Sequence, residues 1–459
     1  MSFLVRRLRF TALPMMALLA GLVVIVIASS SGSASAVSSK VVTFAYPSTY
    51  VLDTPQLATR WVNEVVQQFQ QANPGVRVNL VPIPGSYNDI VTKMSLLYRS
   101  PSTAPDVSLV PTGQVGLWAS SGYLSPMNSY LPSTSWWQHF PAVVQREGNI
   151  KGHIYAVNQS EVVIALMYDK TLFARAGLPV PWKPTSWNDI LTAARKIKKA
   201  LPGVTPFWMN AGSGSGSAGL EQGINNFIYG TSTPQIVIGS KVVIDSPGIR
   251  AALAFLKTVI SEGLDASESQ LFNPSAVATP LTLFPKGKLA IAVGATYFPG
   301  AWTKFVSAPY WPQAPTVMAS TPVPHQTGGG IASTLGAWDY VLSARSKNPS
   351  AAFKLISVLE DKRNSLDVAN WAGGVPPDSQ YWSDPTYTAF AKGQAYFAQL
   401  LPHATLTPSG SSYPVWAQGM ENATAAIVQN PATSIDDAIS ILGTFVKNQL
   451  GSSETIVLH

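Results

Sequence analysis

The chain has 459 residues, of which 46% are hydrophobic and 12% charged, and its formal net charge is +7. This length predicts two or three domains with sizeable cores, and the composition excludes a mainly disordered chain. The absence of cysteine excludes disulfide scaffolds, thiolate zinc sites, iron–sulfur clusters and a lipid anchor on cysteine. Without Arg6, Arg7 and Arg9, the remaining 27 basic and 23 acidic residues give +4, so a nucleic-acid partner is not expected.

The first 36 residues have the features of an export signal. Three arginines precede an uncharged run at 10–28, and small residues then lead to Ala34-Ser35-Ala36. Signal peptidases cut after such a motif, which predicts a mature start at Val37. Nineteen helical residues span about 28 Å, close to the hydrocarbon thickness of about 30 Å, so residues 10–28 kept as a membrane anchor are the alternative. The cleaved signal and the retained anchor both predict that the bulk of the chain is exported, to the cell surface, the extracellular space or the periplasm.

The low charge also gives a hypothesis about the surroundings of the protein. Many Ser, Thr and Pro residues and few charges suit an exported protein in acid, where titrating carboxylates would otherwise leave unbalanced positive charge.

Apolar periodicity and capping residues predict alternating strands and helices. Residues 41–45 form a strand, a helix capped by Thr54 follows up to Asn73-Pro74-Gly75, and residues 76–80 form the next strand. This unit is typical of an α/β domain with a parallel sheet. Further strands are predicted at 106–110, 162–167, 289–293 and 338–342, and helices after Ser186, from Pro247, from Pro349 and after Ser434.

Catalytic motifs are largely missing. No two histidines stand four residues apart, and there is no Gly-x-Ser-x-Gly elbow, Ser-x-x-Lys pair or phosphate-binding loop. Residues 214–219 match the dinucleotide glycine pattern, but alternating Gly and Ser match it by composition, and the segment is interpreted as a flexible loop. A pair of carboxylates for glycoside cleavage stays open, since such a pair meets only in the fold. We predict no metal and no cofactor.

Six segments stand in an order that resembles a known family. They are residues 69–94, 104–131, 151–190, 284–302, 343–359 and 432–442. The most specific is 151–190, with a Gly-x-Ile-Tyr entry and Ala-Gly-Leu before a Ser-Trp helix start. Together they resemble the extracellular solute-binding proteins of bacterial ABC importers, in the sugar-binding, maltose-binding-protein-like class called family 1. Two features depart from the family pattern: no anchoring cysteine follows the leader, and Asn158 stands where many members have proline.

The resemblance implies an α/β fold with two lobes, each a mainly parallel sheet flanked by helices, and a hinge between them. The implied boundaries are 1–36 for the leader, 37–156 with 332–385 for lobe 1, and 157–331 with 386–459 for lobe 2. The ligand lies between the lobes, and hinge closure buries it from both sides. The implied partners are a small solute and the membrane permease subunits of the importer, and we expect a monomer.

The resemblance also suggests which side chains meet the ligand. They are polar or aromatic residues in loops that follow strands or at crossings between lobes: Tyr46, Tyr50, Tyr87, Thr112, Gln114, Gln159, Glu161, Tyr297, Trp302, Trp371 and Trp416. Each has an alternative role, in core packing for the aromatic residues, in turn capping for Thr112 and Gln114, and in a solvated hinge for Gln159 and Glu161. A sugar suits such a set, because its apolar faces stack on rings and its hydroxyls bind polar side chains.

The predicted function is therefore the substrate-binding component of an ABC importer that captures a sugar or small oligosaccharide, without catalysis. The alternatives are a binding protein for a peptide, a polyamine or a phosphorylated polyol, and a secreted glycoside hydrolase.

Overall fold

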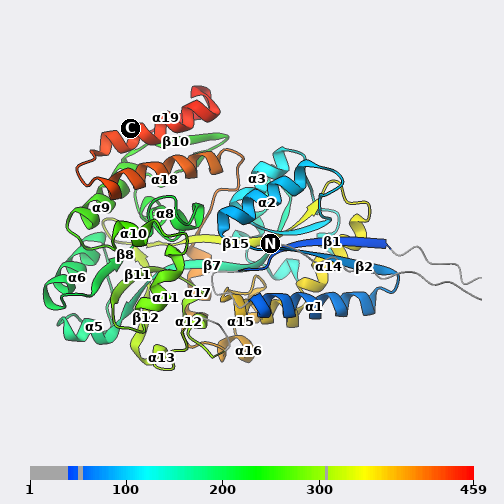
Figure 1. Ribbon diagram of the computed structural model, residues 1–459, viewed down its shortest axis with the longest axis horizontal. Helices are drawn as coiled ribbons and strands as arrows, with labels where there is room; N and C mark the ends of the chain where they lie inside the picture. The colour runs from blue at the N-terminus through cyan, green and yellow to red at the C-terminus, as the bar shows by residue number, and fades with distance from the viewer. Residues whose placement is uncertain (1–39, 50–54, 305–308) are drawn as a thin grey trace, which may run out of the picture. The chain divides into compact units, whose positions relative to one another are not determined.

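The computed structural model describes residues 40–49, 55–304 and 309–459 (Figure 1). These described ranges form one compact unit. The predicted export signal, Tyr50 and the predicted helix cap Thr54 lie outside the described residues. Within the described ranges, no helix is long and apolar enough to cross a membrane.

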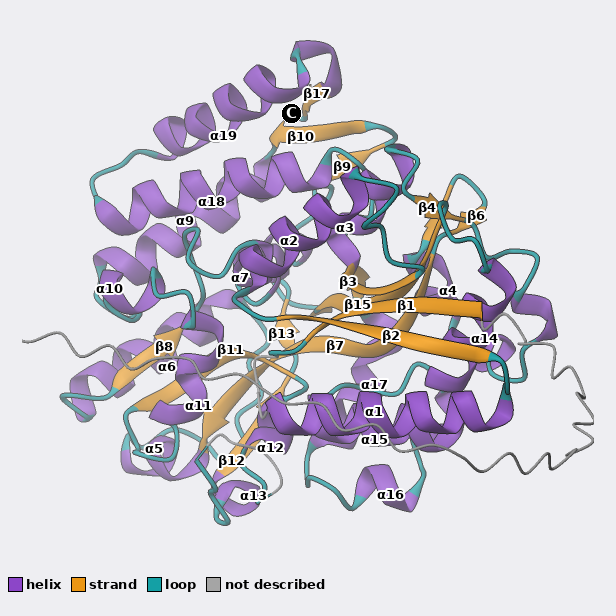
Figure 2. Ribbon diagram, turned by 45° about the vertical axis from the view of Figure 1, so that its right-hand side comes forward, coloured by secondary structure: helices purple, strands orange, loops and turns teal. Residues whose placement is uncertain are grey.

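The largest element is a ten-stranded sheet, with the main order β2-β1-β3-β15-β7-β11-β8 (Figure 2). These strands are β1 (Lys40–Pro47), β2 (Val76–Ile83), β3 (Val107–Pro111), β7 (Ala156–Asp169), β8 (Thr205–Trp208), β11 (Leu289–Ala295) and β15 (Thr334–Ser343). Beside this path, β4 (Leu124–Ser125), β12 (Met318–Thr321) and β16 (Thr405–Leu406) complete the sheet. Smaller sheets join β5 (Asn149–Ile150) to β6 (His153–Ile154), β13 (Val323–Pro324) to β14 (Ile331–Ala332), and β10 (Lys241–Asp245) to β9 (Val237–Ile238) and β17 (Thr455–Val457).

Helices alternate with the strands along most of the chain. The α-helices of the described residues are α1 (Pro55–Ala72), α2 (Tyr87–Arg99), α3 (Thr112–Ser120), α4 (Ala142–Glu147), α5 (Lys170–Arg175), α6 (Trp187–Ala200), α7 (Ser217–Glu221), α8 (Ile224–Tyr229), α9 (Pro247–Ser261), α10 (Glu268–Leu271), α11 (Thr279–Leu283), α12 (Phe298–Ala301), α13 (Ala314–Val317), α14 (Pro349–Leu359), α15 (Lys362–Ala372), α16 (Pro385–Thr388), α17 (Gln394–Leu400), α18 (Tyr413–Gln429) and α19 (Ile435–Leu450).

One end of the sheet has the predicted strand–helix–strand architecture. Strand β1 pairs in parallel with both β2 and β3, and α1 and α2 connect them. Figure 1 shows α2 and α3 on one face of β1 and β2, and α1 and α14 on the other. The inward stripe of α1 contains the predicted Trp61, Val65 and Phe69, all buried. At the other end, β8 and β11 also pair in parallel. The α/β class is confirmed.

Two long strands, β7 and β15, connect the two ends. They pair antiparallel with each other, β15 pairs antiparallel with β3, and β7 does so with β11. The predicted strands at 162–167 and 338–342 are only the apolar parts of these longer strands. The first half of β7 holds Asn158, Gln159, Ser160 and Glu161, all buried. Buried polar residues conceal a strand from a rule based on apolar runs.

Capping residues set several helix starts as expected. Ser186 and Asp189 form a capping box before α6, and Ser434 and Asp437 form one before α19. Such a box satisfies backbone N–H groups that have no partner within the helix. The starts of α9 at Pro247 and of α14 at Pro349 also agree with the sequence prediction.

Candidate ligand-binding pocket

A pocket of about 380 Å³ lies where the strands of the main sheet end. Its first wall is formed by residues at or just beyond the ends of β1, β2 and β3: Thr49, Gly85, Ser86, Tyr87, Ile90, Pro111 and Thr112. Its second wall is formed by lining residues within 215–222 after β8, by Tyr297 after β11, and by lining residues within 274–278, between α10 and α11. Ligands of open α/β sheets bind beyond the carboxyl ends of the strands, and the first wall and the parts of the second wall that follow β8 and β11 satisfy this rule.

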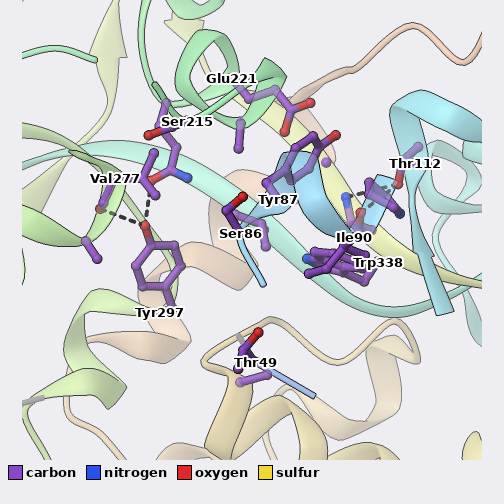
Figure 3. A pocket seen from close by; sticks show the side chains of 18 of the residues that line it. Thr49, Ser86, Tyr87, Ile90, Thr112, Ser215, Glu221, Val277, Tyr297 and Trp338 are labelled. Atoms are coloured by element: carbon purple, nitrogen blue, oxygen red, sulfur yellow. Dashed lines mark hydrogen bonds between the residues drawn. The ribbon is translucent and has the colours of Figure 1, made fainter. Parts of the chain in front are cut away.

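The floor of the pocket comes from the middle of the long strands. Ser160 and Val162 of β7 and residues 336–338 of β15 line it. Thr112 fixes the first wall to this floor, because its hydroxyl donates to Ala337 O at 3.0 Å and accepts from Ala337 N at 3.1 Å (Figure 3). The floor is therefore held by backbone pairing and one buried hydroxyl.

Two aromatic rings form a corner between the first wall and the floor. The Tyr87 and Trp338 ring centroids are 6.2 Å apart and the planes meet at 69° (Figure 3). The Tyr87 hydroxyl lies 2.8 Å from Ser217 Oγ, so it reaches the second wall. Burial, followed by the charge of Glu221, raises the pKa of the Tyr87 hydroxyl above its usual value. The ring is a neutral plate at physiological pH.

A third ring, that of Tyr297, belongs to the second wall. Its hydroxyl donates to Gln222 Oε1 at 2.7 Å and is 3.1 Å from Val277 O (Figure 3). Both partners also line the pocket. The ring is thus held by two neighbours of its own wall, and the side chain is 4% exposed.

The second wall also offers two polar groups to a ligand. The Oγ of Ser215 is buried and has no hydrogen-bond partner among the described residues. Burial raises the pKa of the Glu221 carboxyl to about 8, so this side chain carries a proton at neutral pH. A buried polar group without a partner is costly, and a ligand hydroxyl in the pocket would supply the missing bond.

The glycine- and serine-rich segment at 212–217 brings the two walls together. Gly216 has φ +58°, and a Cβ at this position would lie 2.5 Å from Asn88 Oδ1 and 3.0 Å from Tyr87 Cδ1. Only glycine permits this approach and this backbone conformation. Residues 214–219 match a dinucleotide pattern in sequence, but in the structure Gly216 packs against α2, and Gly212 and Gly214 lie against Phe272.

The pocket lining contains no Lys, Arg or His among the described residues. In the same part of the chain, no group of three or more His, Cys, Asp and Glu side chains is placed to hold a metal ion.

Comparison with known families agrees with this arrangement. Residues 55–366 match the family described as bacterial extracellular solute-binding protein. The chain belongs to this family. Among relatives of this solute-binding protein, the "Probable ABC transporter-binding protein" of Deinococcus radiodurans is 24% identical over 301 residues, which are 64% of this chain and 68% of the relative.

A second relative and a solved structure extend the comparison. The sn-glycerol-3-phosphate-binding periplasmic protein of Rhizobium meliloti is 25% identical over 156 residues, 32% of this chain and 36% of the relative. The maltose-bound MalE3 of T. maritima superposes with a TM-score of 0.73 at 19% identity, covering 89% of this chain and 100% of that one. This superposition supports the same fold for the solute-binding protein.

Three of the side chains predicted from sequence line the pocket: Tyr87, Thr112 and Tyr297. Gln114 lies two residues beyond Thr112 on α3 and is buried. Glu161 follows Ser160 in the floor strand and is completely buried. Tyr50 lies outside the described residues.

The other predicted side chains do not line this pocket in the described structure. Tyr46 packs on Phe44 at 5.5 Å, and Gln159 donates to Tyr340 Oη at 2.9 Å. The ring of Trp371, in α15, lies 5.9 Å from the ring of Trp61, in α1. Trp302 and Trp416 are buried and donate their ring N–H to backbone carbonyls. A buried indole needs such an acceptor, and each of the two finds it in the packed interior.

Several pocket residues were missed from sequence. Trp338 lies within the apolar stretch of β15 and looked like a core residue. Ser215, Glu221 and Gln222 follow the short strand β8. Tyr87 was predicted because ligand-facing residues follow strand ends. The same rule applies to these three residues.

Proposed function

We propose that this solute-binding protein is the substrate-binding component of an ABC importer, and that it captures a sugar or small oligosaccharide in the pocket. It then delivers the sugar to membrane permease subunits. The observation that carries the proposal is the lining itself, in which the rings of Tyr87, Trp338 and Tyr297 stand among hydroxyl, amide and protonated carboxyl groups. The pocket volume of about 380 Å³ falls within the ordinary range for small-molecule sites, about 300–1,000 Å³.

The two walls support the proposal of two lobes, 37–156 with 332–385 and 157–331 with 386–459. Strand β7 begins at Ala156 and β15 at Thr334, so two of the three proposed crossings, at 156/157 and 331/332, fall near the start of a long strand. The third, at 385/386, falls at the start of α16. The first wall belongs to lobe 1 and the second wall to lobe 2. A ligand that touches both walls stabilises the closed arrangement, because closure needs contacts that exist only in the closed state.

Charge favours a neutral sugar over a phosphorylated polyol, the ligand named for the Rhizobium meliloti relative. Phosphate binding in proteins relies on Arg or Lys and on free helix N-termini. The described lining has no cationic side chain. The N-terminus of α2 faces the pocket, but the Asp89 carboxylate already accepts from Ser86 N at 2.9 Å. The Asp89 carboxylate thus already occupies the end of the helix that an anionic ligand would need.

Binding without catalysis is the second part of the proposal. Glycoside hydrolysis needs two carboxyl groups that flank the scissile bond. In the described lining, Glu221 is the one acidic side chain. We further propose that the protein is exported as a monomer, either released after cleavage at Val37 or tethered through residues 10–28.

Thermal unfolding tests the function directly. The chain from Val37 is measured with glucose, maltose, maltotriose and ribitol, and with sn-glycerol 3-phosphate and spermidine as charged probes. A true ligand at a hundred times its Kd adds about 2.7 kcal/mol of stability. We expect a neutral sugar to give this shift and Tyr87→Ala to abolish it, while Tyr310→Ala, at a tyrosine that is 61% exposed, leaves it unchanged.

Other results would contradict the proposal. Stabilisation by sn-glycerol 3-phosphate or spermidine, with none from the neutral sugars, would overturn the ligand class. Release of glucose from maltose at catalytic protein concentrations would make the protein a hydrolase.

A further inference from the structure

Three carboxyl side chains are buried together behind the floor of the pocket. Glu147 ends α4, Glu161 lies in β7 and Asp339 lies in β15. All three are at most 1% exposed. Charged carboxylates are almost never buried without a partner of opposite charge.

Among the described residues, one amide donates the hydrogen bonds that these carboxyls accept. Asn158 Nδ2 donates to Glu147 Oε2 at 2.8 Å and to Asp339 Oδ1 at 2.9 Å, using both of its N–H groups. The second oxygens of Glu147 and Asp339 and both oxygens of Glu161 have no partner among the described residues. Glu147 and Glu161 lie close enough for each carboxyl to shift the pKa of the other.

No cationic side chain of the described residues forms an ion pair with this group, which we call the carboxyl cluster (Glu147, Glu161 and Asp339). The neighbours that shift its pKa values are Thr112 of α3, whose hydroxyl already donates to Ala337 O, and two further buried carboxyls, Glu221 and Glu360. Burial raises the pKa of Glu147 to about 7 and raises those of Glu161 and Asp339.

The carboxyl cluster and the pocket floor belong to the same two strands. Trp338 and Ser160 are register partners and line the pocket, while the residues that follow them in β15 and β7 are Asp339 and Glu161. The ladder shifts register between Trp338 and Asp339. Any repulsion within the carboxyl cluster therefore acts directly on the strands that place Trp338 in the pocket.

We propose that Glu147, Glu161 and Asp339 share protons around Asn158 and act as positioning residues for the pocket floor, so that the floor holds its shape in acid and loosens as the cluster ionises. Two or three negative charges in this dry space repel one another, and Asn158 can donate only two hydrogen bonds. The strands must then separate or admit water. This inference concerns the pocket of the proposed function, but its test uses no ligand.

The first measurement is the free energy of unfolding in urea between pH 5 and pH 8. Its slope with pH gives the number of protons released on unfolding. Because the folded cluster keeps protons that the unfolded chain loses, stability falls as the pH rises. We expect Glu161→Gln and Asp339→Asn, which keep the shape but cannot ionise, each to release about one proton fewer than the wild type. Glu268→Gln, at an exposed glutamate of α10, serves as the matched control and keeps the wild-type slope.

The second measurement locates the effect. Hydrogen exchange, corrected for the intrinsic pH dependence, is compared at pH 5 and pH 8 for peptides covering β7 and β15, with β10 as the internal reference. We expect the wild type to lose at least tenfold protection in β7 and β15 at pH 8, and the folded variants to retain it.

Equal slopes in the wild type and both variants would overturn the proposal. So would wild-type protection of β7 and β15 that changes no more than that of β10, a result that is decisive even where a variant does not fold. Neither result tests the proposed sugar binding, since no sugar is present in either measurement.

Discussion

The contact between the two pocket walls gives the most specific prediction. Tyr87 Oη and Ser217 Oγ lie 2.8 Å apart and join α2 to α7. A neutral hydrogen bond contributes about 0.5–1.5 kcal/mol net, and a buried polar group left without a partner costs about 1–3 kcal/mol. Ser217 is 8% exposed, so Tyr87→Phe leaves its hydroxyl largely away from water. We expect Tyr87→Phe and Ser217→Ala each to cost about 1–2 kcal/mol of unfolding free energy.

The double variant separates this contact from other effects of the two substitutions. Once either hydroxyl is gone, removing the other has little further cost, so the double variant should be about as stable as the weaker single variant. The expected coupling energy is about 1 kcal/mol, measured by urea unfolding of all four proteins without ligand. Independent sites add within about 0.3–0.5 kcal/mol. Additive costs would show that the walls do not touch in the free protein in solution, and would refute the reasoning.

Three further predictions follow from single side chains. Burial raises the pKa of Glu221 to about 8, above the unfolded value of about 4.3, so its contribution to stability is complete below pH 4.3 and is lost as the pH rises through 8. Glu221→Gln should therefore reduce the slope of unfolding free energy against pH by up to about 1.4 kcal/mol per pH unit, and an unchanged slope would contradict this. Trp416→Phe removes the ring N–H that donates to a backbone carbonyl, so it should cost about 1–3 kcal/mol of unfolding free energy and leave the sugar affinity measured by calorimetry unchanged. Trp338→Ala should weaken that affinity at least tenfold, and an equal loss of affinity in the two variants would argue against the pocket. Gly216→Ala places a Cβ against α2 at a positive φ and should cost at least about 1–2 kcal/mol in thermal unfolding, and a neutral substitution would show that this approach of the walls is absent.

The fold was largely predictable because its signals are local. The capping box of Ser186 with Asp189, the apolar stripe of α1 and the buried strands each lie within a few consecutive residues. The long crossing strands were only partly predictable. The polar residues at 158–161 are buried by the fold as a whole, and no local pattern shows that an amide will bridge two carboxyls there. Asn158, a departure from the family pattern in sequence, acquires a role only in the structure.

The candidate site was predictable where a residue follows the end of a strand within a few positions. Tyr87, Thr112 and Tyr297 all satisfy this condition, and all line the pocket. Tryptophans were harder to assign. Trp338 in an apolar strand faces the pocket, while Trp416 in a late helix is 0% exposed. Whether an indole finds its acceptor in the core or keeps a face for a ligand depends on residues far away in the chain, which composition and spacing do not reveal.

The hypothesis of an acidic environment came from composition alone and stays a prediction. The structure adds a physical reason for it, since buried carboxyls such as Glu147 and Glu221 hold protons that alkaline conditions would remove.

The central claim is that one sugar is held between both walls of the pocket. Hydrogen exchange of the Val37–His459 chain, with and without the sugar that stabilises it best, tests this claim most directly. We expect slower exchange in the peptides that hold residues 85–90, residues 215–222 and the floor strand β15, with the terminal helix α19 unchanged. Protection confined to one wall, or found only outside these segments, would contradict it.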